Sequence, residues 1–159
     1  RPADLRVLGN RGASGVDGVT STALGAGSGT GDPLVAVLGD LAYYHDMNGL
    51  LAVGRCDVDA TVVLLNNDGG GIFHMLPVED FDPPFTEQFR TPHGLDFAPT
   101  GDLYGLDYRR VAPADFADAF DDAVAADGTR VLEVRTDAEA SHRAREALRD
   151  DVVAALTDG

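Results

Sequence analysis

Apolar and polar positions alternate in blocks along the chain, and these blocks predict strands and helices in turn. Short segments rich in Val and Leu have the length of buried parallel strands; they lie at residues 5–8, 33–38, 61–65 and 130–135. A further short strand is predicted at residues 108–111. Helical patterns occupy residues 19–26, 45–53, 102–107, 113–126 and 137–156. Strands that alternate with helices predict a three-layer α/β/α fold whose mainly parallel sheet has about six strands.

Three of the predicted helices carry apolar side chains that we expect to face the sheet. They are Met47, Leu50 and Leu51 in the first, Phe116, Phe120 and Val124 in the second, and Ala144, Leu148, Val152 and Leu156 in the last. Residues 77–99 hold many prolines and aromatic residues and show no period. A long irregular segment in a compact domain is usually functional or mobile.

Two of the predicted strands end in oxygen-bearing residues. Gly39-Asp40 follows one run, and Asn66-Asn67 with the turn Asp68-Gly69-Gly70-Gly71 follows the next. If the two strands are parallel neighbours, Asp40 and Asn67 meet at the edge of the sheet where open α/β folds bind ligands. Carboxylate, amide and carbonyl oxygens suit Mg²⁺. The alternative is an ordinary βαβ unit with polar strand ends.

The charge of the chain is strongly negative. Its 159 residues carry a net charge of −15, and all twelve basic residues are arginines. Nucleic acid is an unexpected partner, because binding it needs clustered positive charge. We interpret the spread of acidic residues as an adaptation to high salt, which screens self-repulsion. A metal ion then becomes more necessary for holding a diphosphate on so acidic a protein.

Other features place the chain among cytoplasmic proteins. Cys56 is the single cysteine, so no internal disulfide forms and a reducing compartment is expected; we interpret it as a bystander. No apolar run approaches the roughly 18–20 residues of a membrane span. Arg1 to Asp4 lead directly into the first apolar run, so we expect no signal peptide.

The pair Gly39-Asp40, followed about 25 residues later by Asn66-Asn67, resembles the motif of thiamine diphosphate (ThDP) enzymes. In that family the Asp, the second Asn and a backbone carbonyl two residues later hold Mg²⁺ or Mn²⁺. The matching positions are Asp40, Asn67 and Gly69. The resemblance also implies cofactor contacts at Ser14, Gly15, Val16, Gly39, Asp40, Leu41, Asn67, Gly69, Gly70, Ile72 and Phe73.

Three further stretches narrow this resemblance over nearly the whole chain. They are Arg11 to Gly18, Asn67 to Phe73 and Thr91 to Phe97. Together they resemble the carboxyl-terminal, diphosphate-binding domain of the 2-succinyl-5-enolpyruvyl-6-hydroxy-3-cyclohexene-1-carboxylate (SEPHCHC) synthase family of menaquinone biosynthesis. The run Arg11-Gly12-Ala13-Ser14-Gly15 is its most specific part, because ThDP enzymes in general lack it.

The resemblance implies a transferase that decarboxylates 2-oxoglutarate and adds the resulting carbanion to isochorismate. Val16 matches the bulky residue under the cofactor. Arg11 matches a residue that pairs with a substrate carboxylate, a task that suits the guanidinium fork. Ile72, Phe73 and Leu76 match the apolar wall of the substrate pocket.

The family's activating glutamate lies in an amino-terminal domain that has no counterpart here. We therefore expect residues 1–159 to be a single diphosphate-binding domain, a fragment without the pyrimidine-binding and middle domains and inactive alone. No residue of this fragment is expected to be catalytic. The complete site would need the pyrimidine-binding domain of a second subunit, in a homodimeric or homotetrameric parent.

Several alternatives stay open at this point. The chain could belong to another ThDP-dependent carboligase, similar to acetolactate synthase, or be a stand-alone cofactor-binding module. Arg11 could form a surface ion pair, the residues at 72, 73 and 76 could be simple core, and Gly69 to Gly71 could be only a turn. Roles for His45, His74, His93 and Asp17 are left unassigned.

Overall fold

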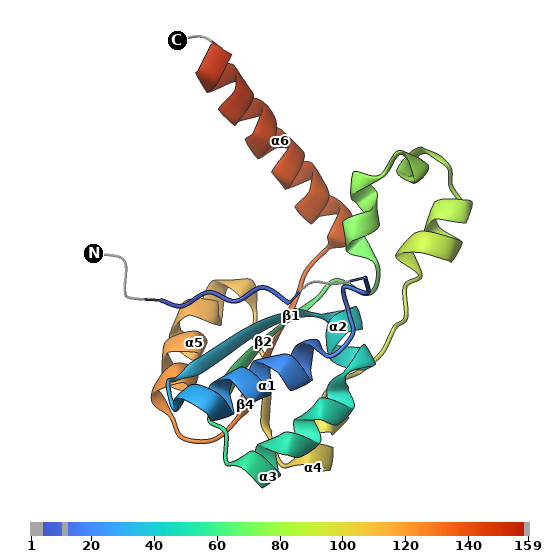
Figure 1. The fold of residues 1–159 in the computed structure, drawn as a ribbon. Coiled ribbons are helices and arrows are strands. Elements are labelled where there is room, and N and C mark those ends of the chain that lie inside the picture. Colours follow the sequence, from blue (N-terminus) through green and yellow to red (C-terminus); the bar gives the residue numbers. More distant parts are fainter. Residues whose placement is uncertain (1–4, 11–12, 158–159) are drawn as a thin grey trace.

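A computed structural model describes residues 5–10 and 13–157 of the chain (Figure 1). The helices are α1 (Val19–Thr30), α2 (Asp40–His45), α3 (Val53–Cys56), α4 (Pro99–Tyr104), α5 (Phe116–Ala125) and α6 (Ala138–Thr157). The strands are β1 (Leu34–Gly39), β2 (Ala60–Asn66), β3 (Asp107–Arg110) and β4 (Arg130–Arg135). Short helical turns are η1 (Met47–Ala52), η2 (Gly71–Met75), η3 (Pro77–Asp80), η4 (Thr86–Arg90) and η5 (Pro113–Asp115).

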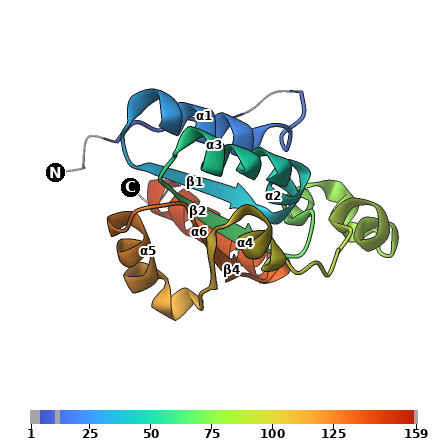
Figure 2. The ribbon, with the colours of Figure 1, turned by 90° about the horizontal axis from the view of Figure 1, so that it is seen from below.

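The sheet is parallel throughout, in the order β1-β2-β4-β3, and helices flank it (Figure 2). Crossovers between parallel strands need a helix, which explains why helices separate the strands along the chain. The predicted α/β fold is therefore confirmed. The described residues form four strands, fewer than the six expected.

The strand predicted at residues 5–8 is wrong. Leu5, Val7 and Leu8 are 77%, 86% and 69% exposed, and no strand pairs with this segment in the described part of the chain. A strand needs a paired neighbour and a buried face to be stable. The apolar run alone could not supply either.

The core lies mainly on one face of the sheet. Leu38, Val62, Leu64 and Val131 of the strands pack there against side chains of α2, η1 and the segment before α4. Tyr43 of α2 is fully buried, and its hydroxyl lies 2.7 Å from Thr100 Oγ1. This packing fixes α2, whose first residue is Asp40, against the sheet.

The predicted inner faces of the helices are only partly correct. Leu50 is buried, whereas Leu51 and Val124 are exposed. The apolar stripe of α6 is also exposed, at Ala144, Leu148, Val152 and Leu156, because this helix leaves the body of the molecule after its first turns (Figure 1). In the part of the chain that the structure describes, no helix has both the length and the apolar character needed to cross a membrane.

Candidate functional site

The candidate site lies at the carboxyl ends of β1 and β2. The two strands pair in parallel with Gly39 opposite Leu65, so the residues that follow them emerge at one edge of the sheet. Asp40 is only 2% exposed, although it carries a carboxylate. A buried carboxylate needs hydrogen-bond donors around it.

The Asp40 carboxylate receives these donors from two stretches of backbone. Its Oδ1 accepts the N–H of Leu41 at 2.7 Å. Its Oδ2 accepts the N–H groups of Asn67 at 3.1 Å and Gly69 at 3.0 Å. Three residues predicted as metal ligands are therefore adjacent, and Asp40 ties the end of β1 to the turn after β2.

The imidazole of His93 completes this arrangement. Its Nδ1 accepts the N–H of Leu95 at 2.9 Å, so the ring proton lies on Nε2, which donates to Asp40 Oδ2 at 3.2 Å. The sequence left His93 without a role. His93 lies 53 residues after Asp40 in a segment without a periodic pattern, so the sequence did not indicate this contact.

Asp68 makes a second connection to the same segment. Its Oδ1 accepts the N–H groups of His93 at 3.1 Å and Gly94 at 2.7 Å, while its own N–H donates to Asn66 Oδ1 at 3.1 Å. The turn after β2 and residues 93–94 are thereby fixed to each other. The Asn-Asn-Asp-Gly sequence indicated a turn but not this contact.

The glycines of the turn are required by close packing. Gly69 has φ of +124°, and a Cβ on it would overlap the carbonyl oxygen of Arg90. The N–H of Gly70 donates to that same oxygen at 2.7 Å, and a Cβ on Gly70 would overlap the carbonyl of Phe89. The backbone of this turn therefore lies directly against the backbone of residues 89–91.

These residues fit a hard divalent cation. Among the described residues, no cluster of three or more His, Cys, Asp or Glu side chains could hold a metal by itself. A metal at this edge would have to combine the Asp40 carboxylate with amide and carbonyl oxygens. Asn67 carries a side-chain amide and Gly69 a backbone carbonyl, and the N–H groups of both residues lie within 3.1 Å of Asp40 Oδ2. That donor set matches the preference of Mg²⁺ for oxygen and for sites completed by phosphate and water.

A family model described as "Thiamine pyrophosphate enzyme, C-terminal TPP binding domain" matches residues 5–134. The chain belongs to this family. Thiamine pyrophosphate is another name for ThDP, and the residues at the sheet edge are those that the sequence had assigned to this cofactor and its metal. The βαβ unit without a ligand is thus not favoured.

Curated relatives of the ThDP family agree closely with the resemblance found in the sequence. A protein of Haloarcula marismortui named 2-succinyl-5-enolpyruvyl-6-hydroxy-3-cyclohexene-1-carboxylate synthase is 68% identical over 98% of this chain. One of the same name from Halobacterium salinarum is 67% identical over 96%. The chain spans 26% of the length of each. Both organisms are halophiles, in keeping with the acidic composition.

A solved structure of the same family supports the fold. A thiamine diphosphate-dependent 4-hydroxybenzoylformate decarboxylase of Rhodococcus jostii superposes with a TM-score of 0.63 and 28% sequence identity. The match covers 72% of this chain and 22% of that one. The parallel sheet and its flanking helices are therefore those of a ThDP-enzyme domain.

The glycine-rich stretch before α1 lies near the same sheet edge. Gly15 and Gly39 line one cavity of about 410 Å³ with Leu8 and Asn10. Ser14 is exposed and Val16 is half-buried. Arg11, predicted to bind substrate, lies outside the described residues.

The predicted substrate wall is not part of the core. Ile72 is 68% and Leu76 is 45% exposed, whereas Phe73 packs edge-on against Phe89 with ring centroids 5.9 Å apart. The simple-core interpretation is therefore wrong for Ile72 and Leu76. These two apolar side chains therefore lie at the surface, in the segment that follows the turn after β2.

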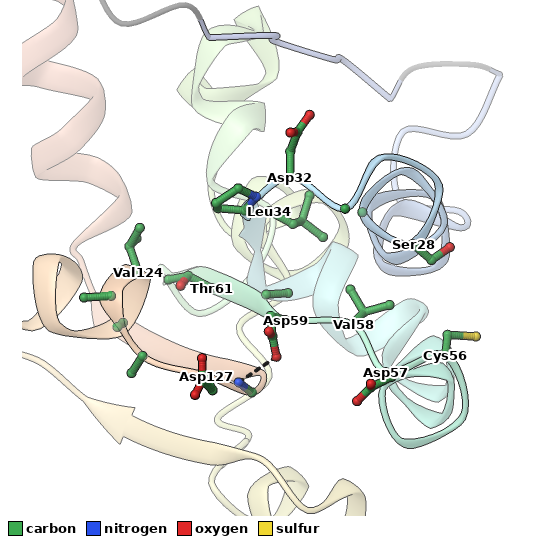
Figure 3. Close-up of a pocket in the computed structure, with 18 residues that line it drawn as sticks. Ser28, Asp32, Leu34, Cys56, Asp57, Val58, Asp59, Thr61, Val124 and Asp127 are labelled. Carbon is green, nitrogen blue, oxygen red and sulfur yellow. Dashed lines mark hydrogen bonds between the residues drawn. The ribbon is translucent and has the colours of Figure 1, made fainter.

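A cavity of about 370 Å³ lies at the opposite edge, beside the amino ends of β1 and β2 (Figure 3). Asp32, Asp57, Asp59 and Asp127 line it, and Asp59 Oδ1 accepts the N–H of Gly128 at 2.7 Å. None of the described residues that line it is basic. A diphosphate would be repelled there, so this cavity is not the ThDP-family site.

One buried carboxylate near the site was missed from sequence. Glu133 of β4 is fully buried and accepts hydrogen bonds from Asn66 Nδ2 at 2.7 Å and Arg110 Nε at 2.6 Å. Burial raises the pKa of Glu133, but its bonds to Arg110, Asn66 and Arg135 outweigh burial and hold that pKa below its ordinary value. Glu133 therefore stays charged and anchors Asn66, beside Asn67.

The remaining unassigned residues have local partners. His45 Nε2 lies 3.3 Å from Asp17 Oδ1, with both side chains more than half exposed. His74 is buried, and its Nδ1 lies 2.8 Å from Glu79 Oε1. Cys56 is exposed. None of these four side chains is bonded to Asp40.

Proposed function

We propose that this chain is the ThDP- and Mg²⁺-binding domain of a SEPHCHC synthase. The observation that carries the proposal is the convergence of Asp40, Asn67 and Gly69 at one sheet edge, in a chain nearly covered by relatives that bear this name. The whole enzyme would decarboxylate 2-oxoglutarate and add the remaining carbons to isochorismate, in menaquinone biosynthesis.

The residues of the sheet edge would hold the metal and the diphosphate. Asp40, Asn67 and Gly69 would ligate Mg²⁺, which neutralises the diphosphate on an acidic protein. Backbone N–H groups of Ser14 and Gly15 would contact the cofactor, Gly39, Leu41 and Gly70 would lie against it, and Val16 would lie beneath it. When bound, ThDP supplies the electron sink for decarboxylation, while the protein supplies orientation.

The substrate side would be formed by Arg11 and the apolar wall. Arg11 would pair with a substrate carboxylate, because a guanidinium binds carboxylates bidentately. Ile72, Phe73 and Leu76 would cover the carbon skeleton and exclude water. The complete site also needs the pyrimidine-binding domain of a second subunit, so the parent is a cytoplasmic homodimer or homotetramer in this proposal.

Turnover by the full-length protein tests the proposal. Purified protein with ThDP and Mg²⁺ is given 2-oxoglutarate and isochorismate, and product is followed by mass spectrometry. The expected result is one adduct that requires both substrates. Decarboxylation of pyruvate with condensation to acetolactate, and no use of isochorismate, would instead favour the acetolactate-synthase-like alternative. Arg11, the run Gly71-Ile72-Phe73 and the relatives of 68% and 67% identity named SEPHCHC synthase argue against that alternative.

A further inference from the structure

We propose that Glu79 is a positioning residue for the substrate wall, because it ties the segment that carries Ile72 and Phe73 to α6. The inference rests on the proposed function. Glu79 Oε1 accepts hydrogen bonds from His74 Nδ1 at 2.8 Å and from the Arg143 guanidinium at 2.7 Å. We call the group His74, Glu79, His142, Arg143 and Glu146 the Glu79 clasp.

His74 depends on Glu79 for its hydrogen bonding. The ring is 6% exposed, packs edge-on against Phe85 at 4.8 Å, and is stacked on His142 with centroids 5.8 Å apart. Its Nε2 is buried and has no hydrogen-bond partner among the described residues. Loss of the Glu79 carboxylate would thus leave the whole buried ring without a strong acceptor, which is costly.

The other half of the clasp is the first two turns of α6. Arg145 can only donate, so its contact at 3.1 Å with His142 Nδ1 places the ring proton of His142 on Nε2. That atom lies 3.4 Å from Glu146 Oε1 and 3.7 Å from Glu79 Oε2. Arg143 joins the two carboxylates by donating to Glu146 Oε2 at 3.0 Å as well.

A short hydrogen-bonded path connects the clasp to the substrate wall. The N–H of Glu79 donates to Leu76 O at 3.0 Å, and the N–H of Leu76 donates to Phe73 O at 3.0 Å. His74 itself follows Ile72 and Phe73 in η2. The side chain of Ile72 is 68% exposed, so burial does not fix it and its backbone must. At its start η2 also lies close to α6, since a Cβ on Gly71 would come within 3.1 Å of the Ala138 Cβ.

The charges around Glu79 keep it ionised. The hydrogen bond from His74 and the nearby charge of Arg143 lower the pKa of Glu79, against the opposing effect of burial. From α6 it faces His142, Arg143 and Glu146, and from its own segment His74. Asp82, Arg90, Asp137 and Glu139 line the adjoining cavity. Glu79 is therefore an anion between two imidazoles and a guanidinium at neutral pH.

Steady-state kinetics of the full-length protein tests this inference with Glu79→Gln, Glu79→Asp and a matched control, Glu87→Gln. Glu87 is exposed in η4, and among the described residues its side chain has no hydrogen bond or ion pair. Glu79→Gln should raise KM for isochorismate about tenfold with kcat nearly unchanged and a smaller change in ThDP affinity, because the displaced wall mainly weakens substrate binding. Glu79→Asp, which keeps the charge, should restore part of the loss.

Amide hydrogen exchange in the same proteins provides the second readout. Residues 71–76 should exchange faster in Glu79→Gln than in Glu87→Gln, while the strands stay unchanged. Equal KM values and equal exchange in these two variants would overturn the inference. So would a matching fall in ThDP affinity, which would mark Glu79 as a general structural residue. A wild-type protein that does not use isochorismate would refute the proposed function, whereas the exchange comparison would still decide the clasp.

Discussion

Asp40 Oδ2 accepts the backbone N–H of Gly69 at 3.0 Å, across 29 positions of sequence. This bond joins the ends of two neighbouring parallel strands through a carboxylate that is 2% exposed. A buried carboxylate that accepts these backbone N–H groups is held in one position, so the ends of the two strands are fixed relative to each other. Its contacts are the basis of the first two predictions.

Binding of ThDP should require Mg²⁺ and Asp40. Asp40→Ala should abolish binding and Asp40→Asn should weaken it strongly, because the metal loses a charged ligand. Calorimetry on the 159-residue chain, with and without Mg²⁺, measures this, and Asp118→Ala in the exposed face of α5 is the matched control. Equal ThDP affinity in the presence and absence of Mg²⁺ would contradict the assigned metal site.

Gly69→Ala should destabilise the turn. A Cβ at φ +124° is strained and would overlap the carbonyl oxygen of Arg90, so we expect a loss of about 1–3 kcal/mol. Thermal unfolding should then shift down by several degrees, at about 2–4 °C per kcal/mol. Gly54→Ala, a helical position with open space around it, should leave the midpoint unchanged or raise it slightly. A similar midpoint for both variants would refute the packing argument.

The charge of Glu133 should contribute stability that disappears in acid. Its pKa in the folded chain lies below the ordinary value of about 4.3, so its contribution is complete above that value and falls as pH drops through the folded pKa. At pH 7, Glu133→Gln should cost about 1.5–3 kcal/mol, the magnitude of hydrogen bonds to a charged group. Urea unfolding from pH 7 to pH 3 should show the gap to wild type closing. A constant gap would mean that ionisation is not its source.

The 159-residue chain should not turn over 2-oxoglutarate by itself. Its glutamates are Glu79, Glu87, Glu133, Glu139 and Glu146, and none of them matches the family position that activates the cofactor. Release of CO₂ with ThDP and Mg²⁺ should equal that of ThDP and Mg²⁺ without protein. Release above this background would show that the chain holds a complete site.

Arg11→Ala in the full-length protein should spare ThDP affinity and lower kcat/KM for isochorismate about ten- to a hundred-fold, the effect of one charge-assisted hydrogen bond. Arg11→Lys should restore only part, because a point charge does not reproduce the guanidinium fork. An unchanged KM with lost ThDP affinity would make Arg11 a cofactor residue instead.

Strands buried on both faces were readily predicted, because runs such as Val62-Val63-Leu64-Leu65 are continuously apolar and lie within the observed β2. Their parallel pairing brought Asp40 and Asn67 together as expected. Two predictions failed where a partner was assumed: residues 5–8 lack a neighbouring strand, and the stripe of α6 lacks a covering surface in the described chain. An amphipathic pattern shows that one face of a helix is apolar, but it does not show which surface packs against that face.

Contacts made by irregular segments could not be predicted. His93 reaches Asp40, and Asp68 holds the backbone of residues 93–94, through a stretch that has neither period nor cap signal. The Glu79 clasp likewise joins a short helical turn to α6, which is far away in sequence: Glu79 and Arg143 are 64 positions apart. Such pairings depend on tertiary geometry, which local residue preference does not encode.

The hydrogen bond from the Gly70 N–H to the Arg90 carbonyl also constrains how this domain can be recombined with its relatives. Residues 39–41, 66–71 and 90–94 share hydrogen bonds, and at Gly69 and Gly70 a Cβ would overlap the backbone of residues 89–91. A chimera whose crossover separates these stretches would take them from two different proteins, so their contacts would no longer match. Crossovers placed in the exposed segment of residues 112–115 or after Arg135 would transfer the three stretches as one inherited unit.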